Sequence, residues 1–226
     1  MSSPGFYVSP DQLIADRAEF ARTGIGKGRS VVVCGCAAGV LFVAENPSRM
    51  LQKIGEIYDR IGFAGVGKYN EFETLRVAGI RYADLRGYSY DRADVSARAL
   101  AQMYAQTLAA VFTQASKPFE VELVVGEVGQ TPDRDQIYRL GYDGSVTDEP
   151  GYVVVGGDWE PLARRMRQEW LPGMTLPAAL RVALDVLGTS APLSPAQVEV
   201  ALLDRARDRR TFRRLGPDAL AGLLIG

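Results

Sequence analysis

The stretch Ser30–Gly67, SVVVCGCAAGVLFVAENPSRMLQKIGEIYDRIGFAGVG, decides the fold. Residues 31–37 and 40–45 are β-branched or apolar, and the small pair Ala38-Gly39 between them is typical of a tight hairpin. An Asn-Pro-Ser turn then ends the second strand, and residues 57–66 predict a third strand. Because the apolar runs are nearly continuous rather than alternating, we expect a sheet that is covered on both faces.

The segment before this block predicts a helix. Ser9 is expected to cap it, Pro10 suits the first helical position, and Gln12 can complete a capping box. The helix should end near Thr23, with Gly24 as its C-cap. Apolar residues recur along it at helical spacing, and they are Leu13, Ile14, Ala18, Ala21 and Ile25.

The rest of the chain continues in groups of helices and groups of strands. Further helices are predicted at residues 72–83, from Asp91 or Asp94 to about 116, at 159–170, 175–187 and 218–224. Further strands are predicted at residues 121–128, 137–142, 152–155, 197–203 and 211–215. This order favours an α+β fold in which two packed sheets carry helices on their outer faces, a four-layer αββα sandwich, over alternating βαβ units.

The bulk composition excludes several functions. With 226 residues, 47% hydrophobic content and a net charge of −1, the chain gives no electrostatic reason to expect nucleic acid. No apolar run approaches the roughly 18 residues of a membrane span, and no signal peptide is visible, so we expect no membrane partner. The absence of histidine excludes Ser-His-Asp catalysis and His-ligated metals. We therefore predict no metal and no cofactor.

The two cysteines also bear on location. Cys34 and Cys36 are two residues apart in one predicted strand, so they should point to the same face and stay buried as free thiols. Without a structural disulfide, a reducing cytoplasm is the expected location.

Two motifs allow a functional and a structural interpretation. Residues 62–68 match a phosphate-binding loop until Tyr69, which replaces the Ser or Thr that would hold Mg²⁺. We favour tight turns or close packing at Gly65 and Gly67 over nucleotide binding. A basic run near the C-terminus could bind phosphate, but we favour a charged hairpin whose arginines are solvated or paired across subunits. These arginines are Arg205, Arg207, Arg209, Arg210, Arg213 and Arg214.

Several long strings resemble one family. The chain is similar to the α subunits of the bacterial, actinobacterial-type proteasome core particle over essentially its full length. The resemblance lies in YVSPDQLIADRAEFARTGI (7–25), GVLFVAENPSRMLQKIGEIYD (39–59), GKYNEFETL (67–75), residues 105–119 with the EVEL strand after them, and YRLGYDGSVTDEP (138–150). It implies the sandwich of the N-terminal-nucleophile hydrolases, which agrees with the αββα order.

The resemblance also implies a role without catalysis. Catalytic relatives begin the first strand with a processed threonine whose free amino group acts as the base. Here Arg29-Ser30 stands at that point, and a capped helix precedes it. The alternative is a self-processing hydrolase that cleaves before Ser30 and uses it as the nucleophile. The family role is to form seven-membered outer rings around β-subunit rings, in a particle of fourteen α and fourteen β subunits.

The resemblance assigns further sites. Ring-shaped AAA ATPase activators insert their C-terminal tails between neighbouring α subunits, where a lysine meets the tail carboxylate. By the string QKI that lysine is Lys53, with Gly28 and Arg22 near it. Apart from the resemblance, the apolar stripe of the first helix needs a partner, so Leu13 and Ile14 are predicted to serve ring assembly. Residues 9–226 are expected to form one domain.

The first eight residues are a predicted gate that closes the ring entrance. Serine, proline and glycine in this segment predict mobility. The gate residues are Met1, Ser2, Ser3, Pro4, Gly5, Phe6, Tyr7 and Val8.

Overall fold

Two antiparallel sheets of five strands form the centre of the molecule. The computed structural model describes residues 9–48, 50–188 and 193–225, so the predicted gate segment lies outside the described residues. The first sheet has the order β10-β9-β2-β1-β8 and the second the order β3-β4-β5-β6-β7. The first sheet consists of β1 (Val31–Cys36), β2 (Gly39–Glu45), β8 (Tyr152–Val155), β9 (Val198–Asp204) and β10 (Phe212–Arg214). The second consists of β3 (Ile54–Tyr58), β4 (Ile61–Gly67), β5 (Val121–Glu127), β6 (Gln136–Leu140) and β7 (Val146–Asp148).

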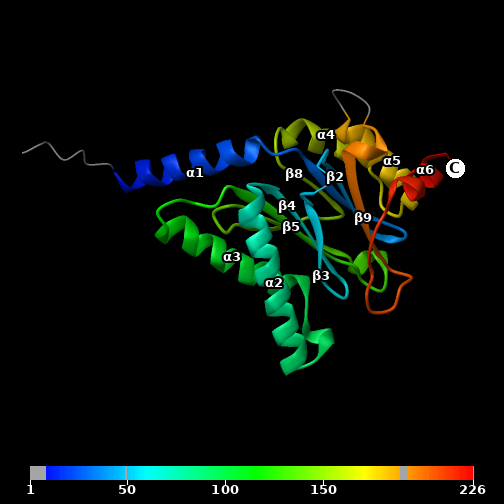
Figure 1. Ribbon diagram of the computed structural model, residues 1–226, viewed down its shortest axis with the longest axis horizontal. Helices are drawn as coiled ribbons and strands as arrows, with labels where there is room; N and C mark the ends of the chain where they lie inside the picture. Colours follow the sequence, from blue (N-terminus) through cyan, green and yellow to red (C-terminus); the bar gives the residue numbers. More distant parts are fainter. Residues whose placement is uncertain (1–8, 49, 189–192, 226) are drawn as a thin grey trace, which may run out of the picture.

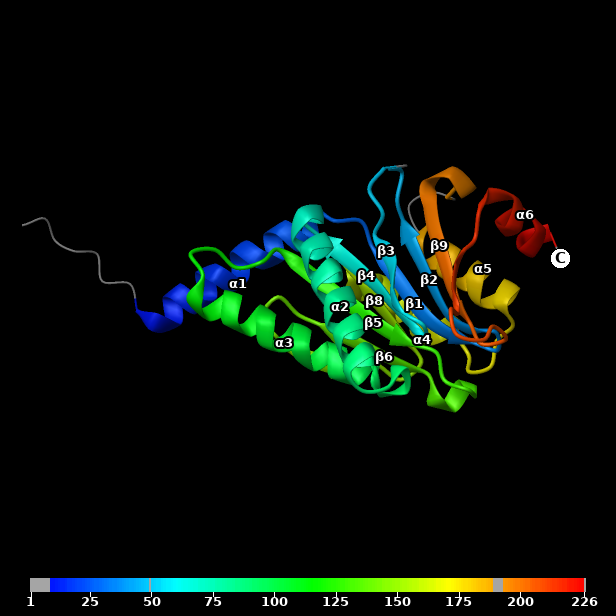
Figure 2. The ribbon, with the colours of Figure 1, turned by 60° about the horizontal axis from the view of Figure 1, so that its bottom comes forward.

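Helices cover the outer faces of both sheets (Figures 1 and 2). The helices of the described chain are α1 (Pro10–Gly26), α2 (Tyr69–Ser89), α3 (Ala97–Gln114), α4 (Trp159–Glu169), α5 (Leu176–Leu187) and α6 (Pro217–Ile225), with short 3-10 turns η1 (Arg92–Asp94), η2 (Pro132–Arg134) and η3 (Pro195–Gln197). The first sheet packs on α4 and α5, and the second packs on α2 and α3. This arrangement is the predicted αββα sandwich.

Strand β1 shows how the sequence pattern builds the layers. Val31 and Val33 face the second sheet, whereas Val32, Cys34 and Cys36 face the helices, because side chains alternate along a strand. All five are buried, which explains the continuous apolar run. The cysteines are free and share one face, as predicted, and burial raises the pKa of both thiols.

The predicted hairpin between the first two strands is confirmed, but the third predicted strand is wrong. Strands β1 and β2 pair in antiparallel register through the turn before Gly39, whose φ is +143°. Residues 57–66 are not one strand, because Asp59 and Arg60 form a turn between β3 and β4. Strand β7 was not predicted, since its three residues are exposed and carry no apolar alternation.

Helices α1 and α3 differ from prediction in three respects. Ser9 caps α1 by accepting from the Gln12 amide, as expected, but the Gln12 side chain donates to Asp16, so no capping box forms. The helix continues past Gly24, where a Cβ atom would collide with the Glu120 side chain, and its C-cap is Lys27.

The third difference concerns the start of α3. This helix begins after Ser96 rather than Asp91 or Asp94. Asp91 instead caps the short turn η1 by accepting from Ala93 N.

The glycines of the phosphate-loop motif lie inside strand β4 instead of a loop. Cβ atoms on Gly62 and Gly65 would lie 2.9 Å from Phe42 Cζ and 2.6 Å from Phe72 Cγ, respectively. Gly67 has a φ of +102°, a conformation that side chains disfavour. The amides of this segment pair with β3 and β5, which leaves no phosphate cradle.

Most of the basic run forms ion pairs within the chain, whereas arginines that are solvated or paired across subunits were expected. The β9–β10 hairpin folds against β3, and its arginines pair both with carboxylates of other segments and with carboxylates of β9. The pairs are Arg205–Asp135 (2.8 Å), Arg210–Glu56 (2.6 Å), Arg213–Asp204 (2.9 Å) and Arg214–Glu199 (2.5 Å). Helices long and apolar enough to cross a bilayer are absent from the described part of the chain.

Candidate docking and assembly site

Lys53 ends the loop that joins β2 to β3. Its Nζ atom donates a hydrogen bond to the carbonyl oxygen of Arg29, at 2.6 Å, just before β1 begins. The pKa of Lys53 is lowered to about 8, chiefly by burial and also by the charge of Arg29, while the charges of Glu45 and Glu199 act in the opposite direction. The ammonium is therefore held in one place and has lost part of its hydration.

Among the described residues, the charges around Lys53 are already paired with one another. Arg29 forms an ion pair with Glu45, and Arg214 forms one with Glu199. Lys53, in contrast to Arg29 and Arg214, has no carboxylate within ion-pair distance in the described structure. An incoming carboxylate would find a positive charge in place with little reorganisation.

Gly28 lies beside the carbonyl that Lys53 holds. Its amide donates to the carbonyl of Ile25, at 2.8 Å, and closes the turn after α1. A Cβ atom on Gly28 would lie 2.7 Å from Val66 Cγ1 and 3.0 Å from Gly67 N. Only glycine fits this close approach of the chain to β4, so Gly28 fixes the position of Arg29 and, through it, of Lys53.

Arg22 contacts a different part of the chain. Its guanidinium lies over the ring of Tyr142, 5.9 Å from the centroid. It also lines a cleft of about 520 Å³ together with Asp143, Trp159 and Glu160. The structure thus brings Lys53 and Gly28 together, while the role of Arg22 beside them stays a prediction.

Helix α1 is anchored at one end and extends from the molecule at the other (Figure 1). Ala21 and Ile25 are buried, and this end contacts β4 and β5. Leu13 and Ile14, near the other end, are 53% and 55% exposed. Their apolar surface is available to another subunit.

A second attachment holds the middle of α1. Arg17 donates to the carbonyl oxygens of Phe112 (2.7 Å) and Val111 (3.1 Å). These carbonyls lie in the last turn of α3, where a cation is favourable. Nothing in the local pattern of α1 indicated this contact, which joins residues about 95 positions apart.

Ser30, the alternative nucleophile, is buried at the start of β1. Its hydroxyl lies 3.3 Å from the carbonyl oxygen of Gly156, to which it donates. Its own carbonyl accepts from the Glu45 amide at 3.2 Å. Ser30 is therefore a buried residue that directly precedes β1, and α1 stands between it and the N-terminus.

Comparison with known proteins gives the family of the chain. The family described as "Proteasome subunit" matches residues 25–203. The proteasome subunit alpha of Kineococcus radiotolerans is 59% identical over 236 residues, which cover 100% of this chain and 99% of the relative.

The chain belongs to the proteasome α subunits.

Other α subunits are equally similar. That of Xylanimonas cellulosilytica is 63% identical over 95% of this chain and 93% of its own length. That of Sanguibacter keddieii is 60% identical over 99% of this chain and 90% of its own length. The resemblance found in the sequence is confirmed. As a proteasome α subunit, the chain is a non-catalytic subunit of the core particle and assembles with β subunits in protein degradation.

Proposed function

We propose that this α subunit forms the outer rings of the core particle, seven copies to a ring, and controls what enters it. Residues 1–8 close the axial entrance, and residues 9–226 are the single domain that builds the ring. A ring-shaped AAA ATPase docks on the outer ring and opens it for substrates in the cytoplasm.

The observation that carries the docking proposal is the position of the Lys53 ammonium. It is half-buried, it is held against the Arg29 carbonyl, and the neighbouring charges pair with one another. A peptide C-terminus supplies the missing carboxylate. Charge-assisted hydrogen bonds of this kind are about twice as strong as neutral ones.

The observation that supports a ring is the exposed apolar end of α1. A closed ring needs two different surfaces on each subunit, one for each neighbour. Leu13 and Ile14 supply apolar area on one of them. The anchored end of the helix fixes the direction of this surface. A fixed direction is needed because every pair of neighbours in a closed ring is related by the same rotation.

The proposal is tested by producing the chain with and without a β subunit from the same organism. Native mass spectrometry should show a particle with equal numbers of α and β chains, and electron microscopy should show α rings at both ends. Particles of β chains alone, or α chains in the inner rings, would contradict it. Addition of the organism's own proteasomal ATPase should then increase protein degradation in the presence of ATP.

A further inference from the structure

One carboxylate far along the chain holds the loop that ends in Lys53. Glu199, on β9, accepts hydrogen bonds from the backbone amides of Lys53 (2.8 Å) and Ile54 (3.2 Å). It also accepts from Asn46 Nδ2 at 2.9 Å, and Asn46 begins the same loop. The Glu199 side chain is only 11% exposed, so these bonds compete with little water. Both ends of the loop are thus tied to one rigid strand.

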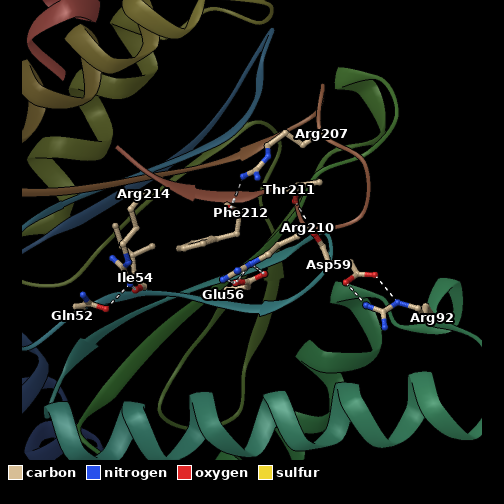
Figure 3. Close-up of polar contacts among 10 residues, drawn as sticks. All are labelled: Gln52, Ile54, Glu56, Asp59, Arg92, Arg207, Arg210, Thr211, Phe212 and Arg214. Atoms are coloured by element: carbon tan, nitrogen blue, oxygen red, sulfur yellow. Dashed lines mark hydrogen bonds and ion pairs between the residues drawn. The ribbon is translucent and has the colours of Figure 1, made fainter. Parts of the chain in front are cut away.

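Arg214 holds the same loop from the edge of the first sheet (Figure 3). Its Nη2 atom donates to Gln52 Oε1 at 2.7 Å and to the Ile54 carbonyl at 2.6 Å. These two residues flank Lys53 on either side. Its Nη1 atom donates to Glu199 at 2.5 Å, so the two tethers are themselves joined.

We propose that Glu199 and Arg214 are positioning residues that fix the Lys53 ammonium for docking of a peptide carboxylate. This inference rests on the proposed docking function. A loop without regular structure needs acceptors for its amides, and a mobile lysine loses side-chain and backbone entropy on binding. Glu199 on β9 and Arg214 on β10 already order the loop, so this entropy is not lost again when the ligand binds.

The alternative is that these contacts only clamp the two sheets together. Figure 3 also shows Arg210, which pairs with Glu56 on the same edge strand β3 but does not bond to the Lys53 loop. Arg210→Gln is therefore a matched control for Arg214→Gln. Each change removes one arginine, in or just before β10, whose side chain binds a residue of β3.

The first measurement is the pKa of Lys53 in the assembled α/β particle with Glu199→Gln. The rate of acetylation of Lys53 by limiting acetic anhydride, followed by mass spectrometry over a range of pH, reports this pKa. Burial is the main cause of the lowered pKa, while the Glu199 charge acts in the opposite direction. If Glu199 positions the loop, its loss frees the lysine into water and the pKa rises towards 10.5. An unchanged or lower pKa would show that Lys53 stays in place without Glu199, and would overturn the inference.

The second measurement is the affinity of a fluorescent peptide copied from the C-terminus of an actinobacterial proteasomal ATPase. The same peptide with an amidated end controls for binding through its carboxylate. Glu199→Gln and Arg214→Gln should each weaken binding about tenfold, while particle mass stays that of the parent. Arg210→Gln should bind as the parent does. An equal loss in Arg210→Gln and Arg214→Gln would mean a general clamp and would overturn the inference.

The variant Lys53→Ala distinguishes a failure of the docking function from a failure of the positioning role. If Lys53→Ala binds the peptide as tightly as the parent, the docking function is wrong, and the acetylation measurement alone decides whether Glu199 positions the lysine. If Lys53→Ala binds weakly but Glu199→Gln and Arg214→Gln bind normally, docking stands and the positioning role is wrong.

Discussion

The ammonium of Lys53 donates a 2.6 Å hydrogen bond to the backbone carbonyl of Arg29. Burial of this group lowers the pKa of Lys53 to about 8, so its charge is lost within a pH range that the particle can be tested in. A carboxylate ligand binds the charged form. Docking should therefore be fully present well below pH 8 and should weaken as the pH rises above it.

The expected size of this effect follows from proton linkage. Above the pKa of the free site, affinity should fall by about tenfold per pH unit until the bound lysine also loses its proton. Titration of a peptide with a free C-terminus between about pH 7 and pH 10 measures this. The amidated peptide should show a much smaller dependence. A flat profile for the carboxylate peptide would mean that the Lys53 charge does not contribute to docking.

Lys53→Ala should weaken activator binding and leave assembly intact. Removing a charge-assisted hydrogen bond costs about 1.5–3 kcal/mol, which is about 10-fold to 150-fold in affinity. Surface plasmon resonance with the immobilised particle and the ATPase gives this number. Lys27→Ala, at the exposed C-cap of α1, is the control and should bind as the parent does. Equal affinity for Lys53→Ala and the parent would show that this lysine is only a solvated side chain.

Deletion of residues 1–8 should increase hydrolysis of short peptides by the assembled α/β particle. If these residues close the entrance as proposed, their removal lowers the barrier to diffusion into the chamber. Fluorogenic peptide turnover measures it, and particle mass confirms assembly. A fully assembled deletion particle with unchanged turnover would refute the gate. Addition of the ATPase should accelerate the parent more than the deletion particle.

The sequence predicted what depends on local patterns. The Ser9 cap, the hairpin at Gly39 and the helix that starts at Trp159 each follow from a few adjacent residues, and the structure confirms them. The order of elements then restricted the fold to an αββα sandwich. Strand β7 was missed because Val146 and its neighbours are exposed. Exposed residues need not alternate between apolar and polar types, so the sequence carries no strand pattern there.

The candidate site could be predicted only in part. Lys53 and Gly28 came from the resemblance, and the structure places Lys53 against the carbonyl that follows Gly28. Glu199 was not predicted, because it lies 146 residues from Lys53 and nothing in its own strand marks it. Contacts of this kind depend on how β9 pairs with β2, which sequence patterns do not specify.

Arg17→Ala should destabilise the isolated chain. The change removes two hydrogen bonds to the carbonyls that end α3, one of them to Phe112, and the packing of the guanidinium over the Phe112 ring. The expected loss is about 1–3 kcal/mol, and each kcal/mol lowers the melting temperature of a chain of this size by about 2–4 °C. Calorimetry measures it. Arg22→Ala, on the same helix but exposed, loses only a contact with the Tyr142 ring and should cost no more than about 0.5–1 kcal/mol. Equal melting of Arg17→Ala and Arg22→Ala would mean that Arg17 does not anchor α1.

The double change Leu13→Asp and Ile14→Asp should prevent ring assembly without unfolding the subunit. Both side chains are more than half exposed in the single chain, so aspartate is hydrated there and costs little. In a ring, the same surface would be covered by a neighbour, and burial of two unpaired carboxylates would cost several kcal/mol. Helix α1 itself should persist, because Ser9, Arg17 and the buried Ala21 hold it independently of these residues.

Analytical ultracentrifugation of the variant with and without β subunits tests this expectation, and circular dichroism must show that the subunit is folded. The matched control is Leu171→Asp, which introduces the same change at a leucine that is 62% exposed on another part of the surface. The control should assemble with β subunits as the parent does, while the double variant should stay monomeric or form irregular species. If the double variant makes complete rings, the exposed end of α1 does not face a neighbouring subunit. The ring contact would then have to lie on a surface that α1 does not provide.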